Sequence, residues 1–220
     1  MIISHKHKFI FIHTNKTAGT SIEEVLLKYN YKVGRRYFLS SGSLYQEHFN
    51  KYKIPLWHIP PQHFNENNNP YNNKTLFTVV RNPYTRIISE YRWYHGFKLK
   101  QKLTVDKLNE WIVSLSSYDI NTNYRINVGH LIPQHIFVQK CDILSKNILK
   151  YENNLDEQLN FLIEDLNLKN IQHKCISLGN ENNVDDTLPR FRVEDLNIKS
   201  INIINKIYKE DFIKFNYKIL

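Results

Sequence analysis

The amino-acid sequence predicts an α/β fold with a central, mostly parallel sheet flanked by helices. Two strand–turn–helix units support this prediction, because such units build parallel sheets covered by helices. The first combines the apolar run 9–12, a polar turn and a helical pattern from Ile22, and the second begins with the apolar run 75–80, which Arg81 follows. At 220 residues, the chain can bury one sizeable core, and we expect a single domain over 1–220.

The remaining elements follow from apolar periodicity and from capping residues along the chain. We expect helices over 41–51, 83–100, 105–116, 156–166 and 200–215, short strands ending at His58 and covering 136–138 and 147–152, and polar loops over 65–73 and 179–192. Asn82 and Pro83 are expected to start the 83–100 helix, and Ser200 is expected to cap the last one.

The charge balance favours an anionic ligand. Lys and Arg number 30 against 21 Asp and Glu, which gives a net charge of +9. The basic residues are spread along the chain without a zinc-finger or RNA-binding signature, so we expect no nucleic-acid partner. Cys141 and Cys175 lack the spacing of a metal or redox motif, and they are expected to be free thiols.

The first residues run directly into the first strand and leave no room for a signal peptide. No run approaches the ~18 apolar residues of a transmembrane helix, so we expect no membrane span. A glycan on Asn15, in the sequence Asn15-Lys16-Thr17, would also block the turn described next. The sequence therefore predicts a cytoplasmic protein of viral or microbial origin.

The turn after the first strand has the composition of a phosphate-binding loop. Its residues are Lys16, Thr17, Ala18, Gly19, Thr20 and Ser21. Free amide groups at a helix start, hydroxyls and an ammonium group together favour an anion. The ATP and GTP pattern G-x-x-x-x-G-K-[ST] is absent, because Lys16 precedes Gly19. The alternative for this stretch is an ordinary turn in which Thr20 only caps the helix.

A second motif follows the 75–80 strand. Arg81 at the strand end can bind a phosphate through two parallel hydrogen bonds, and Ser89 lies two helical turns further on. Residues 81–89 have the form R-[DN]-P-x-x-R-x-x-S. This pattern and the loop at Lys16 together resemble the phosphate-binding motifs of sulfotransferases that use 3′-phosphoadenosine 5′-phosphosulfate (PAPS). The resemblance is to the branch that contains carbohydrate sulfotransferases. The segments 130–134, 149–153 and 207–217 resemble later landmarks of this branch. Asn15 stands where the family usually has Pro, so we expect a slightly looser loop.

The resemblance implies a three-layer fold like that of P-loop-containing nucleoside triphosphate hydrolases. It also implies metal-free sulfuryl transfer from PAPS, with PAP as the product, to an acceptor hydroxyl or amine, with a glycan among the candidates. Lys16 would be catalytic, and the loop residues Lys16, Thr17, Ala18, Gly19, Thr20 and Ser21 would hold the 5′-phosphate. Arg81 and Ser89 would hold the 3′-phosphate, and Arg190 belongs to a late loop that closes over the nucleotide in the family.

The position of His58 between the two phosphate motifs also resembles that of the family's catalytic base, and imidazole titrates in a useful range. His63 is the alternative base. A zinc site built from His58, His63, His130 and His135 is disfavoured, because no acidic or Cys ligand accompanies them at a metal spacing. We expect His130 and His135 to be structural. The aromatic residues Tyr91, Trp93, Tyr94 and His95 are expected to pack in the core, with an acceptor site as the alternative.

Two other functions remain as alternatives. A P-loop-type kinase would need an acidic metal ligand at the end of the 75–80 strand, where this chain has Arg81. A catalytically inactive module that binds PAP or another polyanion would keep the same phosphate motifs. The choice of acceptor depends on variable loops and not on the phosphate motifs.

Overall fold

The computed structural model describes residues 2–4, 7–28, 51–55, 58–63, 73–120, 123–139, 143–166 and 187–220. The predicted helix over 41–51 and the predicted loop over 65–73 lie almost entirely outside these residues, as do Cys141 and Cys175.

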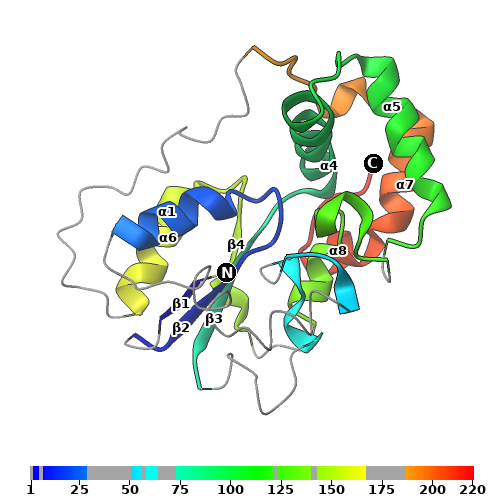
Figure 1. The fold of residues 1–220 in the computed structure, drawn as a ribbon. Helices are drawn as coiled ribbons and strands as arrows, with labels where there is room; N and C mark the ends of the chain where they lie inside the picture. The colour runs from blue at the N-terminus through cyan, green and yellow to red at the C-terminus, as the bar shows by residue number, and fades with distance from the viewer. Residues whose placement is uncertain are drawn as a thin grey trace.

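A four-stranded sheet has the order β1-β2-β3-β4 (Figure 1). Strands β2 (Phe9–Ile12), β3 (Thr75–Val80) and β4 (Ile148–Lys150) are parallel to one another. This arrangement confirms an α/β protein with a mostly parallel sheet. The outer strand β1 (Ile2–Ser4) pairs antiparallel with β2 and was not predicted.

Both faces of the sheet are covered. Side chains along β2 point alternately to the two faces, and those on each face belong to a separate apolar cluster. Phe9 and Phe11 pack beneath α1 (Gly19–Lys28) and α6 (Leu155–Asp165), which lie side by side over one face (Figure 1). The intervening Ile10 and Ile12 pack on the opposite face, against the segments around residues 54–59 and 132–137. The acidic first turn of α6 agrees with the prediction.

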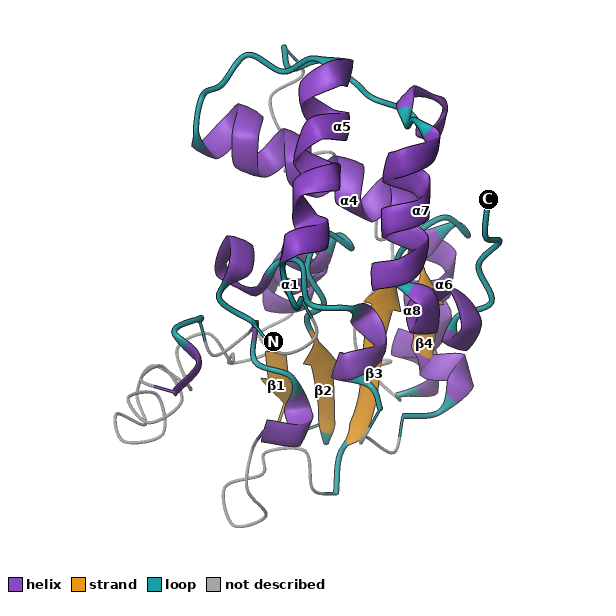
Figure 2. Cartoon of the chain, turned by 90° about the vertical axis from the view of Figure 1, so that its right-hand side faces the viewer, coloured by secondary structure: helices purple, strands orange, loops and turns teal. Residues whose placement is uncertain are grey.

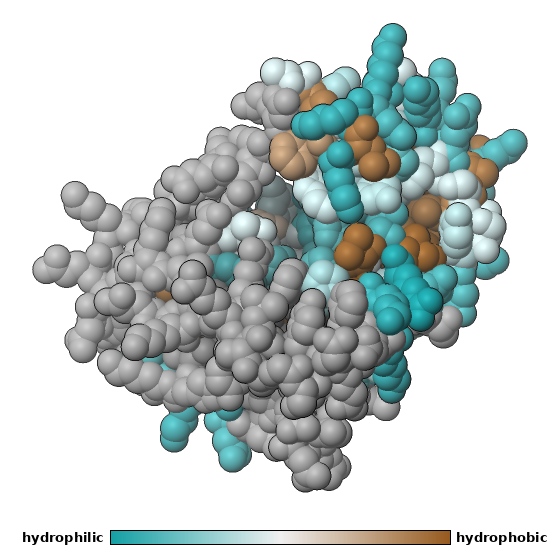
Figure 3. All heavy atoms as spheres, in the orientation of Figure 1, coloured by the Kyte–Doolittle hydropathy of each residue, from teal (hydrophilic) through white to brown (hydrophobic). Residues whose placement is uncertain are grey.

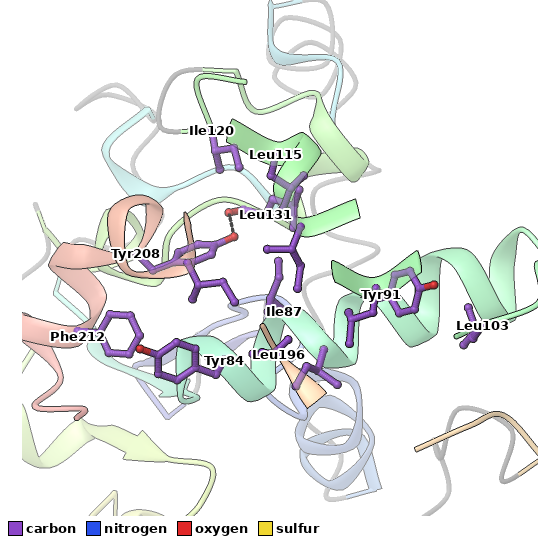
Figure 4. Close-up of a cluster of buried hydrophobic side chains, with 14 residues drawn as sticks. Tyr84, Ile87, Tyr91, Leu103, Leu115, Ile120, Leu131, Leu196, Tyr208 and Phe212 are labelled. Atoms are coloured by element: carbon purple, nitrogen blue, oxygen red, sulfur yellow. Dashed lines mark hydrogen bonds between the residues drawn. The ribbon is translucent and has the colours of Figure 1, made fainter. Parts of the chain in front are cut away.

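A group of helices lies at one end of the sheet (Figure 2). It contains α4 (Pro83–Tyr91), a π-helix (Arg92–Lys98), α5 (Val105–Ser114), α7 (Ile198–Ile207) and α8 (Lys209–Lys214). The α-helices of this group share a buried apolar cluster, in which the Tyr208 hydroxyl donates to the Leu131 carbonyl at 3.0 Å (Figure 4). In the space-filling view, hydrophilic side chains cover much of this group, with smaller hydrophobic areas between them (Figure 3). The group therefore has a core of its own beside the sheet.

The start of α4 is as predicted. Asn82 caps the helix by accepting a hydrogen bond from the Tyr84 amide at 2.9 Å, and Pro83 occupies the first helical position. The predicted helix over 83–100 changes to a π-helix at Arg92. π-Helical turns occur mostly inside α-helices and often at functional sites.

Four other predictions were wrong in detail. A 3₁₀ helix (Gln134–Phe137) replaces the predicted strand 136–138, because the Asp211 carboxylate accepts hydrogen bonds from the amides of Gln134 and His135. The predicted strand 147–152 is shortened to β4, since a turn begins at residue 151. His58 lies in a helical turn and not at a strand end. The last helix is interrupted at Tyr208, and its cap is Asn197, whose side chain accepts from the Ser200 amide.

Among the described residues, no helix combines the length and the apolar character that crossing a membrane requires.

Candidate active site

The turn between β2 and α1 has the backbone of an anion-binding loop. Lys16 and Ala18 have φ angles of 65° and 64°, in the left-handed region. Alternating left-handed residues turn successive amide groups toward one concave side, which is a common anion-binding arrangement. The helix α1 begins at Gly19, so Thr20 lies inside its first turn and not at its cap. Thr20 and Ser21 are both half-buried at the positive end of the helix.

The Thr17 hydroxyl is bound within the protein. It donates to the Thr14 carbonyl at 3.0 Å and lies 2.8 Å from the Thr14 hydroxyl. The Thr14 hydroxyl in turn donates to the Val79 carbonyl in β3. Both threonine side chains are fully buried. The Thr17 hydroxyl therefore fastens the loop to the sheet through Thr14.

Asn15, at the position where the resemblance leads us to expect Pro, is anchored. It is buried, and its side-chain amide donates to the Gly129 carbonyl at 3.0 Å. A tether of this kind fixes the loop to a distant segment, so the structure does not support the expectation of a looser turn.

Arg81 lies beside the loop 16–21. Its guanidinium donates to the Lys16 carbonyl at 3.3 Å and to the Thr85 hydroxyl at 3.1 Å, and it stacks over the Tyr151 ring at 4.3 Å. The Gln134 side chain bonds both the amide and the carbonyl of Arg81, each at 2.8 Å. Residues that follow β2, β3 and β4 thus meet at the carboxyl edge of the parallel sheet, where α/β proteins bind their ligands.

Ser89 is half-buried on α4, roughly 9 Å along the helix from its start at Pro83. The structure therefore places Ser89 on the helix that begins directly after Arg81.

Lys16 carries an unusually acidic ammonium group. The pKa of Lys16 is lowered from 10.5 to about 8, chiefly by burial. The negative charge of Glu90 opposes this change, and the positive charges of Arg81 and Arg92 add to it. The ammonium also lies 5.0 Å from the centre of the Trp93 ring. Lys16 is therefore held in a partly dehydrated position, where its charge acts more strongly than it would in water.

The structure distinguishes the two histidines that were candidates for the general base. His58 is buried, and its Nδ1 donates to the Val128 carbonyl at 2.7 Å, which leaves the lone pair on Nε2. Burial, and then the neighbouring rings of His130 and His13, lower the pKa of His58 well below 6.5. The imidazole is therefore neutral near pH 7. His63 belongs to another group, in which its Nε2 lies 3.0 Å from the Tyr124 hydroxyl.

His13 is a site residue that the sequence analysis missed. Its ring centre lies 6.5 Å from that of His58, and its Nδ1 lies 2.9 Å from the Glu23 carboxylate on α1. That hydrogen bond holds the pKa of Glu23 well below its ordinary value, although burial alone would raise it. Any side chain at position 19 would lie 2.3 Å from the His13 ring, so the close packing of loop and histidine requires Gly19.

A strained turn connects these parts. Asn127, Val128 and Gly129 have φ angles of 46°, 58° and 87°, and the left-handed region is particularly unfavourable for a β-branched residue. The Val128 carbonyl binds His58, and the Gly129 carbonyl binds Asn15. Strained backbone of this kind persists where surrounding contacts hold it, and it clusters at functional sites.

A sequence model described as the sulfotransferase family matches residues 1–218. The chain belongs to the sulfotransferase family. This finding confirms the resemblance drawn from the two phosphate motifs. Comparisons with curated proteins and with solved structures gave no match.

In this sulfotransferase, the described end of the late loop, residues 187–192, is bound by Arg92. Arg92, whose charge lowers the pKa of Lys16, donates to the carbonyls of Leu188 and Pro189 at 3.3 Å and 2.9 Å. Arg190 follows directly and is exposed.

The histidines once considered for zinc separate into different groups. In the described part of the chain, no three His, Cys, Asp or Glu side chains are arranged to hold a metal ion. His135 binds Asp211 at 2.8 Å and is structural, as expected. His130 differs from its prediction, because its ring lies 4.8 Å from that of His58. Trp93 also departs from simple core packing, since it contacts both His130 and Lys16.

Proposed function

We propose that this member of the sulfotransferase family transfers the sulfuryl group of PAPS to an acceptor hydroxyl or amine, with a glycan among the candidate acceptors. The hydrogen bond between the Arg81 guanidinium and the Lys16 carbonyl is the observation that carries this proposal. It joins two motifs that are 65 residues apart in the chain. We further propose that the sheet and its helices form one domain over 1–220, related to the three-layer P-loop nucleoside triphosphate hydrolases.

The residues present fit a nucleotide with phosphates at both ends. The amides of the loop 16–21 and the ammonium of Lys16 suit the 5′-phosphosulfate, because they combine a concave set of donors with a positive charge. Arg81 and Ser89 suit the 3′-phosphate, and Arg190 would close over the nucleotide. When bound, PAPS supplies an activated sulfuryl group on its 5′-phosphate.

The roles of the side chains follow from their environments. His58 accepts the acceptor proton at Nε2 while the acceptor oxygen or nitrogen forms its bond to sulfur. Lys16 stabilises the negative charge that develops on the bridging oxygen as the sulfur–oxygen bond to the 5′-phosphate breaks. The electron pair of that bond would stay with the 5′-phosphate of PAP, and His58 would hold the proton until solvent removes it. Lys16 and Arg81 together supply the positive charge that offsets the negative charge on the bridging oxygen.

Thermal unfolding with nucleotides tests the donor. PAP at about 100 times its dissociation constant should stabilise the protein by about 2.7 kcal/mol, which is a rise of roughly 5–10 °C for a chain of this length. ATP and 5′-AMP should give a smaller rise, because neither carries a 3′-phosphate for Arg81. An equal or larger rise with ATP would favour the kinase alternative.

Transfer of radiolabelled sulfate from PAPS to a panel of hydroxyl and amine acceptors tests the reaction. Label in an acceptor, or label released as inorganic sulfate when water is the acceptor, supports an active enzyme. Stabilisation by PAP without any release of label would favour the catalytically inactive binding module.

A further inference from the structure

Glu90 is a buried carboxylate whose partners lie at the candidate active site. It follows Ser89 on α4, and only 1% of its surface is exposed. Its two oxygens accept hydrogen bonds from His130 Nδ1 at 2.8 Å and from the Asn127 side chain at 3.2 Å. Burying a carboxylate costs several kcal/mol unless hydrogen bonds and nearby charges compensate. The buried Glu90 carboxylate is therefore stabilised by hydrogen bonds from residues around the candidate active site.

His130 connects Glu90 to the candidate base. Its ring meets the His58 ring edge to face, with 4.8 Å between centres and 71° between planes. Because Glu90 accepts from Nδ1, the His130 ring is fixed in one orientation. The Arg86 guanidinium also donates to the His130 carbonyl at 3.2 Å. His58 thus lies against a residue whose ring and backbone carbonyl are each held by a hydrogen bond from α4.

Trp93 extends this set of contacts to Lys16. The Trp93 ring lies 4.5 Å from that of His130, and the Lys16 ammonium lies 5.0 Å from the Trp93 ring. A series of direct contacts therefore leads from Glu90 through His130 to His58, and through His130 and Trp93 to Lys16.

The charges around Lys16 give Glu90 a second role. Arg81 and Arg92 repel the ammonium, whereas Glu90 attracts it. His13, with its partner Glu23, faces His58 from the side of α1. Glu90 is thus the negative charge that opposes the two arginines at Lys16.

We propose that Glu90 and His130 are positioning residues of the sulfuryl-transfer centre. Glu90 fixes the His130 ring, which lies against both the His58 ring and the Trp93 ring beside Lys16, and its negative charge attracts the Lys16 ammonium. The inference rests on the proposed function, because it assigns both residues to the same centre.

A second carboxylate–imidazole pair in the chain serves as an internal comparison. Asp211 is fully buried and binds His135 at 2.8 Å, but it also accepts from the backbone amides of Gln134 and His135. It therefore fastens a backbone segment to α8. Within the described residues, Glu90 accepts from side chains and from no backbone amide. This difference separates a pair that supports the fold from a pair that orients side chains.

The experiment measures PAP affinity by titration calorimetry between about pH 6 and pH 10 for the wild type, Glu90→Gln and the matched Asp211→Asn variant. Glutamine keeps the size of the side chain and one acceptor oxygen for His130, and it removes the charge and the second acceptor, to which Asn127 donates. We expect PAP affinity within about threefold of the wild type near pH 6. As the pH is raised above about 6, Lys16 loses its proton and PAP affinity falls. This fall should begin about one pH unit lower in Glu90→Gln than in the wild type, because a nearby charge shifts the pKa of Lys16 by about this amount. We call the pH at which PAP affinity begins to fall the alkaline limit. Asp211→Asn should lower thermal stability without changing this limit.

A second variant tests the contact with His58 and remains informative if Glu90→Gln does not fold. His130→Asn retains a donor for Glu90 and removes the ring. Hydrolysis of PAPS, in which water is the acceptor, should be about tenfold slower, with the KM for PAPS within about twofold of the wild type. His135→Asn is the matched control, and we expect it to change thermal stability more than hydrolysis.

The outcomes separate the two proposals. If PAP binds the wild type and Glu90→Gln has the same alkaline limit, or if Asp211→Asn shifts the limit as far, the inference is wrong and the proposed function stands. Unchanged hydrolysis in His130→Asn overturns the role of His130 in the same way. If PAP does not bind the wild type at any pH, the proposed function fails, and the inference fails with it.

Discussion

Replacing Lys16 with methionine should stabilise the protein near neutral pH, although it removes a residue proposed for catalysis. Burial first, and then the nearby arginines, lower the pKa of Lys16 from 10.5 to about 8, so the folded chain holds this proton less tightly than the unfolded chain. A difference of this size corresponds to about 3 kcal/mol of unfolding free energy. Methionine keeps most of the packing on Trp93 but loses about 0.5–1 kcal/mol of the cation–π contact. We therefore expect a net gain of about 2 kcal/mol.

The dependence on pH identifies the cause. The destabilisation by charged Lys16 is complete below the folded pKa of about 8, and it disappears as the pH rises to the unfolded value of 10.5. Thermal unfolding should thus show Lys16→Met more stable than the wild type by roughly 4–8 °C at about pH 7, and by much less at about pH 10.

The exposed Lys206 provides the control, because Lys206→Met should change stability by less than about 0.5 kcal/mol at either pH. A loss of stability in Lys16→Met at neutral pH, or a gain of the same size at both pH values, would refute this reasoning.

Three further predictions concern other parts of the site. Arg81→Lys should weaken PAP binding about tenfold or more in calorimetry and reduce the preference for PAP over 5′-AMP, because an ammonium cannot make two parallel hydrogen bonds to a phosphate; an unchanged preference would contradict the role of Arg81. His58→Ala should retain PAP binding and lose most sulfate release from PAPS, whereas His63→Ala should keep both, and full activity of His58→Ala would exclude it as the base. Gly129→Ala should lower the unfolding free energy by about 1–2 kcal/mol in urea denaturation, since φ is 87° there and the new methyl would lie 3.3 Å from His58.

Local patterns predicted the parts of the fold that depend on residues close together in sequence. The run 75–80 followed by Arg81, Asn82 and Pro83 contains a strand, a cap and a helix start in adjacent positions, and the structure has each of them. The strand predicted over 136–138 was wrong because Asp211, more than seventy residues later, binds the amides of this segment. No periodicity within the segment carries that information.

The site was predicted where motifs are contiguous and missed where it is assembled from distant segments. Lys16 and Arg81 stand in recognisable patterns, and they lie together. His13 and Glu90 have no such signal, and the pattern at 130–134 did not reveal the contacts of His130. These contacts form between β2, α4 and the turn at residues 127–130. A polar residue at a helix position otherwise filled by apolar side chains, as Glu90 is among Ile87, Ile88 and Tyr91, was the available hint.

The turn at residues 127–129 bears on the order in which the two substrates of the proposed reaction bind. One of its carbonyls holds the loop that would receive the donor, and the next holds the ring that would receive the acceptor proton. Three left-handed residues in a row leave this turn few alternative shapes. Binding of the donor to this loop would therefore restrain His58 before an acceptor binds. Such a connection favours a compulsory order of binding, with the donor first.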